Sequence, residues 1–201
     1  IMDVVPWMLP YYEASGIQFE IEDNRDYMDY TFTPEQFLAG MDMQDDRYRY
    51  NYFKRRFSYE TEEITPSHQE EIREFMEKEW CGEKTCEECH CGCLLRVVDN
   101  LVPVFDKIRI NGILVRVEGK MAGLCIVSCR NGLGVYQYKN AVNRIKGINE
   151  YLLRESFERY LQSADTINYT EDMGVENLRY YKEHMAPAHT LLSKLTLTER
   201  G

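Results

Sequence analysis

The residues GILVRVEGKMAGLCIVSCRNGLGVYQYKNAVN, from Gly112 to Asn143, form three β-rich segments separated by turn residues. The segments are Gly112–Glu118, Gly123–Arg130 and Val135–Asn143. The pairs between them, Gly119-Lys120 and Asn131-Gly132, are typical of hairpin turns. This part of the chain therefore predicts a meander of antiparallel strands.

Helices and strands alternate after the meander. Gly147 opens an amphipathic helix, with Leu153, Phe157 and Leu161 on one face. Beyond it the pattern predicts a strand, a helix and a closing strand: Asp165–Tyr169, Val175–Met185 and Leu191–Leu197.

The region before the meander is predicted to be mixed. An alternating strand comes first, then an acidic loop, two helices, a strand and two more helices. Their expected ranges are Ile17–Ile21, Glu22–Asp29, Thr33–Leu38, Asp42–Phe57, Tyr59–Ile64, Thr65–Trp80 and Glu87–Val102.

An antiparallel meander followed by a βαβαβ-like tail resembles the GNAT acyltransferase fold. In that fold the helix after the meander begins at an anion-binding loop. We therefore expect an α/β (α+β) fold with a mixed, largely antiparallel sheet flanked by helices.

Composition narrows the classes of function. The 201 residues carry a net charge of -10, which argues against general binding to nucleic-acid backbones. A basic cluster on the second predicted helix is the local exception, and we interpret it as a solvated face: Arg47, Arg49, Lys54, Arg55 and Arg56. There is no run of about 18 apolar residues to span a membrane, and no signal-peptide pattern opens the chain.

The seven cysteines are an odd number and are locally crowded, which favours reduced thiols in a cytoplasm. Cys125 and Cys129 lie on a predicted strand and are expected in the core. The run CGEKTCEECHCGC holds candidate zinc ligands: Cys86, Cys89, His90, Cys91 and Cys93. No second Cys-x-x-Cys or His pair lies elsewhere in the chain, so we favour no metal and interpret Cys86, Cys89 and Cys93 as an apolar helix stripe.

The junction NAVNRIKGINEYLLRES connects the meander to the next helix. Backbone N–H groups at such a helix start can hold the pyrophosphate of coenzyme A. Arg144 and Gly147 fit the usual pattern of such junctions, whereas Asn149 stands where Gly or Ala is usual. The alternative is that Gly147 forms an ordinary helix-start turn.

The stretch NYTEDMGVENLRYYKEHMAP, from Asn168 to Pro187, resembles the terminal signature of the phosphatidylglycerol lysyltransferase C-terminal domain family. Seven residues fall at the spacings of the small bacterial members: Asn168, Asp172, Gly174, Leu178, Arg179, Lys182 and Pro187. Tyr169, Thr170 and Asn177 depart from the signature. Upstream, GILVRVEGKMAG and VYQYKNAVNRIKGINEYLLRESF are also similar to the family. Lys139 matches there, and Tyr138 replaces a usual Glu.

The resemblance implies two tandem GNAT-like halves. Residues 1–57 would be the end of an incomplete N-terminal half, and residues 58–201 a C-terminal GNAT-like domain. It also implies a transferase related to enzymes that move an aminoacyl group from aminoacyl-tRNA to an amine or hydroxyl.

Aminoacyl transfer needs a proton shuttle and donors for a developing oxyanion. The catalytic candidates are Asp172, Glu171 and Lys182. The candidates for binding substrate or donor are Tyr138, Lys139, Arg144, Gly147, Asn149, Asn168 and Arg179. We expect the donor across Tyr138–Asn140 and the Gly147 helix start, with the Asp172–Lys182 corner closing the pocket. The alternative is that Asp172 or Gly174 only caps the helix beginning near Val175.

The favoured function is thus a cytoplasmic acyl- or aminoacyltransferase that uses aminoacyl-tRNA or acyl-coenzyme A as donor. Departures at Tyr138, Asn149, Tyr169 and Thr170 support an alternative, a non-catalytic GNAT-like module that binds a ligand or a protein. Within the enzyme class, the alternative is an acetyl-coenzyme A-dependent N-acetyltransferase. Nothing in the sequence resembles a hydrolase triad.

Overall fold

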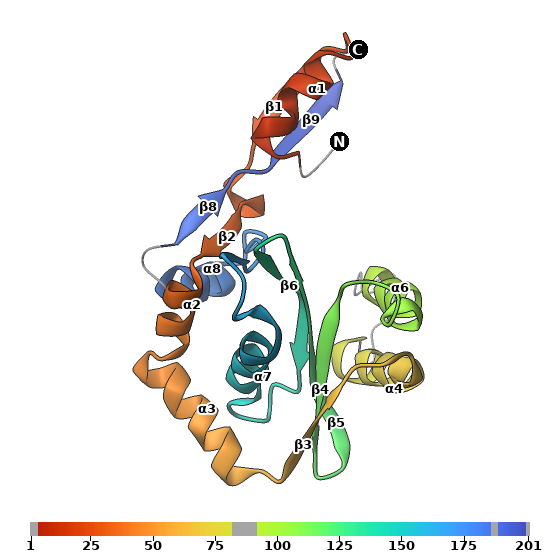
Figure 1. Ribbon diagram of the computed structural model, residues 1–201, viewed down its shortest axis with the longest axis vertical. Helices are drawn as coiled ribbons and strands as arrows, with labels where there is room; N and C mark the ends of the chain where they lie inside the picture. The colour runs from red at the N-terminus through yellow and green to blue at the C-terminus, as the bar shows by residue number, and fades with distance from the viewer. Residues whose placement is uncertain (1–3, 82–91, 186–188, 200–201) are drawn as a thin grey trace.

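The computed structural model describes residues 4–81, 92–185 and 189–199. A seven-stranded sheet forms its centre, in the order β3-β4-β5-β6-β7-β2-β8, and β1 pairs with β9 in a separate ribbon (Figure 1). The strands are β1 Phe19–Asp23, β2 Asp29–Phe32, β3 Tyr59–Glu63, β4 Asn111–Val117, β5 Lys120–Arg130, β6 Leu133–Ala141, β7 Thr166–Asn168, β8 Thr190–Leu192 and β9 Leu195–Glu199.

Helices cover both faces of the sheet (Figure 1). The helices of the described residues are α1 Leu9–Glu13, α2 Pro34–Met41, α3 Gln44–Arg56, α4 Gln69–Met76, α6 Gly92–Leu101, α7 Ile148–Ser156 and α8 Glu176–Met185. Short turns of helix join them: η1 Pro6–Met8, η2 Arg25–Tyr27, η3 Pro66–His68, η4 Glu77–Cys81, η5 Val102–Val104 and η6 Phe157–Leu161. The expected mixed, largely antiparallel sheet is confirmed, because β6 and β7 are parallel and the other neighbours are antiparallel.

The core is split by the sheet into two layers. On one side α2, α3 and α7 bury Phe37, Phe53 and Leu152. On the other side α4 and α6 bury Ile72 and Leu95. Cys125 is buried in the first layer and Cys129 packs against it, as expected. Alternate apolar residues of the meander therefore face the two helical layers on opposite sides of the sheet.

The meander follows the predicted order. Its first turn is centred on Glu118-Gly119, one residue earlier than expected, and its second on Asn131-Gly132. All four residues have positive φ, between 50° and 78°. Such values are those of the two-residue hairpin turns that match the twist of paired strands.

Two predictions at the ends of the chain are wrong. Leu191–Leu197 is not one strand, because β8 pairs with β2 in the main sheet whereas β9 pairs with β1 in the ribbon. The strand β2 was not expected, and the segment just before it, read as a loop, contains η2. With four residues, β2 is too short for a clear alternating pattern.

The ribbon of β1 and β9 projects from the main body together with α1 (Figure 1). Its own small core consists of Val4, Leu195 and Leu197. The first and last described residues are thus joined in one arm. The candidate zinc ligands at 82–91 lie outside the described residues, and the described part of the chain contains no group of three or more metal-ligating side chains.

Candidate functional site

The parallel strands β6 and β7 pair only at one end. Leu133, Gly134 and Val135 are matched with Thr166, Ile167 and Asn168, and the pairing stops there. On its other edge β6 stays paired with β5 as far as Ala141. Beyond Val135, β6 and β7 therefore diverge, and no strand of the described residues pairs with this edge of β6.

A β-bulge in β6 decides which side chains enter this divergence. Tyr136 lies opposite Val127 and Tyr138 opposite Ile126, so Gln137 is the extra residue. After the bulge Lys139 lies opposite Cys125, which belongs to the core layer under α7. Tyr138 instead packs into the layer under α4, where its hydroxyl donates to Met76 Sδ at 3.1 Å. Without the bulge, Tyr138 rather than Lys139 would share the face of Tyr136.

A cavity of about 430 Å³ opens beside the end of β6. Its lining consists of Glu79, Lys139, Asn140, Ala141, Val142, Asn143, Arg144 and Asn149. Asn149 lies in the first turn of α7, so the cavity adjoins a helix start, which favours anions. Three predicted donor-binding residues, Lys139, Arg144 and Asn149, are thus brought together.

Lys139 is the half-buried cation of this cavity. Its Nζ donates to Asn149 Oδ1 at 3.1 Å. Burial lowers the pKa of Lys139, against the attraction of Cys125, Glu150 and Asp46. Such a lysine can take part in proton transfer or donate to a developing negative charge nearer neutral pH than an exposed lysine.

Arg144 is already paired in this structure. Its guanidinium donates to both carboxylate oxygens of Glu79, at 3.1 and 3.3 Å, and its side chain is 73% exposed. An exposed pair of this kind contributes little to stability. Arg144 can therefore exchange Glu79 for an anionic ligand at small cost.

Gly147 shapes the start of α7. Its φ is +89°, and a Cβ there would lie 2.1 Å from the Arg49 carbonyl oxygen. Only glycine permits both the left-handed conformation and the close approach of α3. The predicted role of Gly147 in donor binding stays a prediction, and its contact with α3 is a reason for glycine in its own right.

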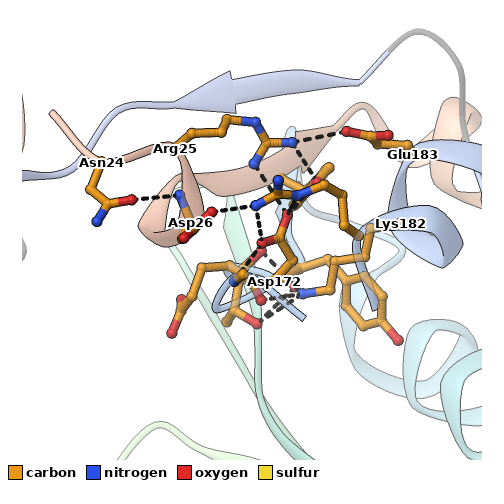
Figure 2. Close-up of polar contacts among 12 residues, drawn as sticks. Asn24, Arg25, Asp26, Asp172, Lys182 and Glu183 are labelled. Carbon is orange, nitrogen blue, oxygen red and sulfur yellow. Dashed lines mark hydrogen bonds and ion pairs between the residues drawn. The ribbon is translucent and has the colours of Figure 1, made fainter. Parts of the chain in front are cut away.

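The predicted catalytic corner lies in a different polar cluster (Figure 2). Asp172 is fully buried and accepts hydrogen bonds from Arg179, Arg25, the Tyr30 hydroxyl and the Gly174 backbone. Donor–acceptor distances range from 2.7 Å, for Tyr30, to 3.2 Å, for Arg25. Burial acts to raise the pKa of Asp172, but the bonds from Arg179, Tyr30 and Gly174 outweigh it and hold that pKa well below its usual range. A carboxylate so satisfied is a weak base.

Lys182 completes this cluster from α8 (Figure 2). It is 3% exposed, and its Nζ donates to the carbonyl oxygens of Tyr169 at 2.6 Å, Glu171 at 2.8 Å and Thr170 at 3.2 Å. Burial lowers its pKa to about 8 despite nearby carboxylates. The ammonium thus ties the loop after β7 to α8.

The remaining predicted residues of the corner also have partners. Asn168 donates to Asp29 at 2.8 Å, and Lys194 binds Asp29 at 2.7 Å and Glu171 at 3.1 Å. None of the residues in this corner lines the cavity beside β6. Their contacts favour a structural role, as in the helix-capping alternative, and their catalytic role stays a prediction.

Arg25, Tyr30, Asp29 and Lys194 were not predicted as members of the cluster. Arg25 and Asp172 are 147 residues apart in sequence, and no local pattern reports such a contact. No local pattern marked Asp29 either, because the short strand β2 that buries it was itself not expected.

A sheet with a diverging parallel pair, covered by helices and followed by a helix start beside a cavity, defines the class of GNAT-like acyltransferase folds. The chain belongs to the family described as "Phosphatidylglycerol lysyltransferase, C-terminal", which matches residues 1–193. No curated protein matches the chain.

Solved structures agree with this assignment. A conserved protein of unknown function from Bacteroides thetaiotaomicron VPI-5482 is 25% identical, with a TM-score of 0.81 over 99% of this chain and 69% of that chain. L-PGS from Bacillus licheniformis is 14% identical, with a TM-score of 0.67 over 100% of this chain and 67% of that one. FemX is 10% identical, with a TM-score of 0.60 over 96% and 69% of the two chains. The last two likenesses concern the fold alone.

Proposed function

We propose that this protein is an acyl- or aminoacyltransferase whose donor binds in the cavity between β6 and the start of α7. The observation that supports it most directly is the divergence of β6 from β7, with half-buried Lys139 at the cavity. Membership of the lysyltransferase family supports the same class of reaction. A cytoplasmic location, suggested by the cysteine content, is part of the proposal.

The unpaired edge of β6 suits an extended donor. A chain that lies along the strand there can hydrogen-bond to backbone groups of β6, in the manner of an added strand. A phosphate or ribose-phosphate part would then meet Arg144 and the first turn of α7. The carbonyl to be attacked would lie near Lys139.

In the proposed transfer, the nitrogen or oxygen of the acceptor attacks the donor carbonyl. A new bond forms to the carbonyl carbon, the ester or thioester bond breaks, and the proton of the nucleophile passes to the leaving group. The Lys139 ammonium would donate to the oxygen on which negative charge develops. Losing one such donor typically slows a reaction by about 10²–10³-fold.

The family favours aminoacyl-tRNA over acyl-coenzyme A as the donor. The net charge of -10 requires any tRNA contact to be local, through groups such as Arg144. Donor binding that weakens steeply with added salt would indicate tRNA. Tight binding of coenzyme A with weak dependence on salt would indicate the N-acetyltransferase alternative.

The test is calorimetric titration with coenzyme A, acetyl-coenzyme A and a minihelix carrying an aminoacyl ester, using wild type and Lys139→Met. Lys120→Met, on an exposed hairpin end, is the matched control. We expect one class of donor to bind. The rate of transfer to an added amine should fall at least about 100-fold in Lys139→Met and stay unchanged in Lys120→Met. Equal transfer by both variants would overturn the assignment of Lys139.

A non-catalytic binding module is the second candidate. It is favoured by the pairing of Arg144 with Glu79 and of Lys139 with Asn149, which leaves the charged groups of the cavity internally satisfied. Donor binding without any transfer, unchanged in Lys139→Met, would support this module over the enzyme.

A further inference from the structure

A second cavity, of about 400 Å³, lies between the start of α3 and the end of α8. Its lining consists of Met43, Gln44, Asp45, Asp46, Arg49, Tyr180, Tyr181, His184 and Met185. It shares no lining residue with the cavity beside β6. Neither the predicted site nor the proposed donor accounts for it.

Aromatic and thioether groups form one wall of this second cavity. The rings of Tyr180 and His184 stack with centroids 3.8 Å apart and planes 26° apart. The stack is fixed because His184 Nδ1 donates to the Tyr180 carbonyl oxygen at 2.7 Å. Such a wall suits the carbon chain of a ligand and the positive charge of an ammonium group.

Asp46 supplies an unmatched carboxylate on the opposite wall. It is half-buried, and within the described part of the chain it makes no hydrogen bond or ion pair. The one arginine or lysine of the lining, Arg49, binds Glu150 at 3.3 Å instead. Burial, and next the Glu150 carboxylate, raise the pKa of Asp46 despite Arg49 and Lys139. The lining holds two carboxylates, Asp45 and Asp46, and one guanidinium, Arg49, which is already paired with Glu150, so a bound cation would balance the charge.

The helix dipole does not by itself account for this arrangement. Asp46 lies in the first turn of α3, where a carboxylate is stabilised even when fully hydrated. A carboxylate in an exposed position would gain the same stabilisation from the helix dipole, without the cost of burial or of a neighbouring carboxylate. The cavity, the aromatic wall from α8 and the carboxylate of α7 are three features independent of the helix start.

The second cavity is also electrostatically coupled to the proposed reaction centre. The Glu150 and Asp46 carboxylates both lie close enough to Lys139 to raise its pKa against the effect of burial. Glu150 follows Asn149, the hydrogen-bond partner of Lys139, directly in α7. Lys139, which lines the first cavity, is therefore influenced by the charge of Asp46, which lines the second.

We infer that the cavity between α3 and α8 binds the ammonium group of a small organic cation, with Asp46 as its counter-ion and the Tyr180–His184 stack against its carbon chain. Its part in transfer rests on the proposed function. The ammonium group belongs either to a free acceptor amine or to the amino acid of an aminoacyl donor.

Calorimetric titration at low salt tests the site with three probes of similar length: cadaverine, lysine methyl ester and the uncharged 1,5-pentanediol. Asp46→Asn removes the counter-ion, and Glu176→Gln is the matched control. Glu176 is an exposed first-turn carboxylate of α8 that lines neither cavity. We expect at least one amine to bind wild type and Glu176→Gln equally, to bind Asp46→Asn about tenfold more weakly, and the diol not to bind.

Binding of cadaverine would identify the source as an acceptor amine, and binding of the ester alone would identify an aminoacyl group. No binding of either amine, equal binding by Asp46→Asn, or equal binding of the diol would overturn the inference. Titration of the wild type with the donors of the β6 cavity separates the two proposals. Donor binding there without amine binding would overturn only the cation site, whereas amine binding without any donor would leave that site standing and overturn the transferase.

Discussion

At the scale of single residues, the contacts of Asp172 show how a structural carboxylate differs from one that reacts. Its carboxylate accepts from two arginines, a tyrosine and a backbone amide, while its side chain is fully buried. Replacing it with Asn leaves two guanidinium groups without their shared counter-ion. We expect Asp172→Asn to lower the free energy of unfolding by roughly 2–4 kcal/mol, measured by urea denaturation.

Asp26→Asn is the matched control, because Asp26 binds the same Arg179 at 2.5 Å but is 45% exposed. Its expected effect is within about 1 kcal/mol. Because the folded-state pKa of Asp172 is depressed, its stabilisation is present above the unfolded pKa of about 3.9 and is lost as the pH falls through the folded value. The difference between wild type and Asp172→Asn should therefore shrink in acid. Unchanged stability with abolished transfer would instead support the predicted catalytic role.

At the scale of elements, two glycines with positive φ test how α3 is fixed against α7. Gly147 has a φ of +89°, and a Cβ there would lie 2.1 Å from the Arg49 carbonyl oxygen. Gly119 has a φ of +75°, and a Cβ there would meet nothing within 4 Å. Gly119→Ala should lower the free energy of unfolding by about 1 kcal/mol, from backbone strain alone. Gly147→Ala should lower it by about 3 kcal/mol or more, because α3 must also move. Equal decreases in the free energy of unfolding, measured by chemical denaturation, would show that α3 moves without an energetic cost.

The same scale shows what the sequence could predict. The meander and its hairpin turns depend on local patterns, so their order was recovered with shifts of a few residues. The bulge at Gln137 is a single extra residue without a local signal, and it decides that Lys139 rather than Tyr138 shares the face of Tyr136. Lys139, Arg144 and Asn149 line one cavity because they flank one strand–helix junction, and their role in donor binding stays a prediction. Two partners of Asp172, Arg25 and Tyr30, could not be predicted, since they lie more than 140 residues away in the sequence.

At the scale of the whole molecule, the first 57 residues contribute a strand and core side chains to the sheet that the rest of the chain forms. The strand β2 lies between β7 and β8, and Arg25 and Tyr30 bind Asp172. Several core side chains also come from this part: Tyr30, Phe32, Phe37, Met41 and Phe53. The predicted boundary after residue 57 would remove all of these contacts.

We therefore expect a fragment of residues 58–201 to lack a cooperative urea transition and a native near-ultraviolet circular dichroism spectrum. A fragment of residues 24–201 is the control, because it loses the arm strand β1 but keeps the seven-stranded sheet complete. It should unfold cooperatively, since the arm contributes only a small separate core. A cooperative 58–201 fragment would show that this part folds alone, as the division into two halves predicts. The buried side chains from residues 30–53 would then cover a core that forms without them.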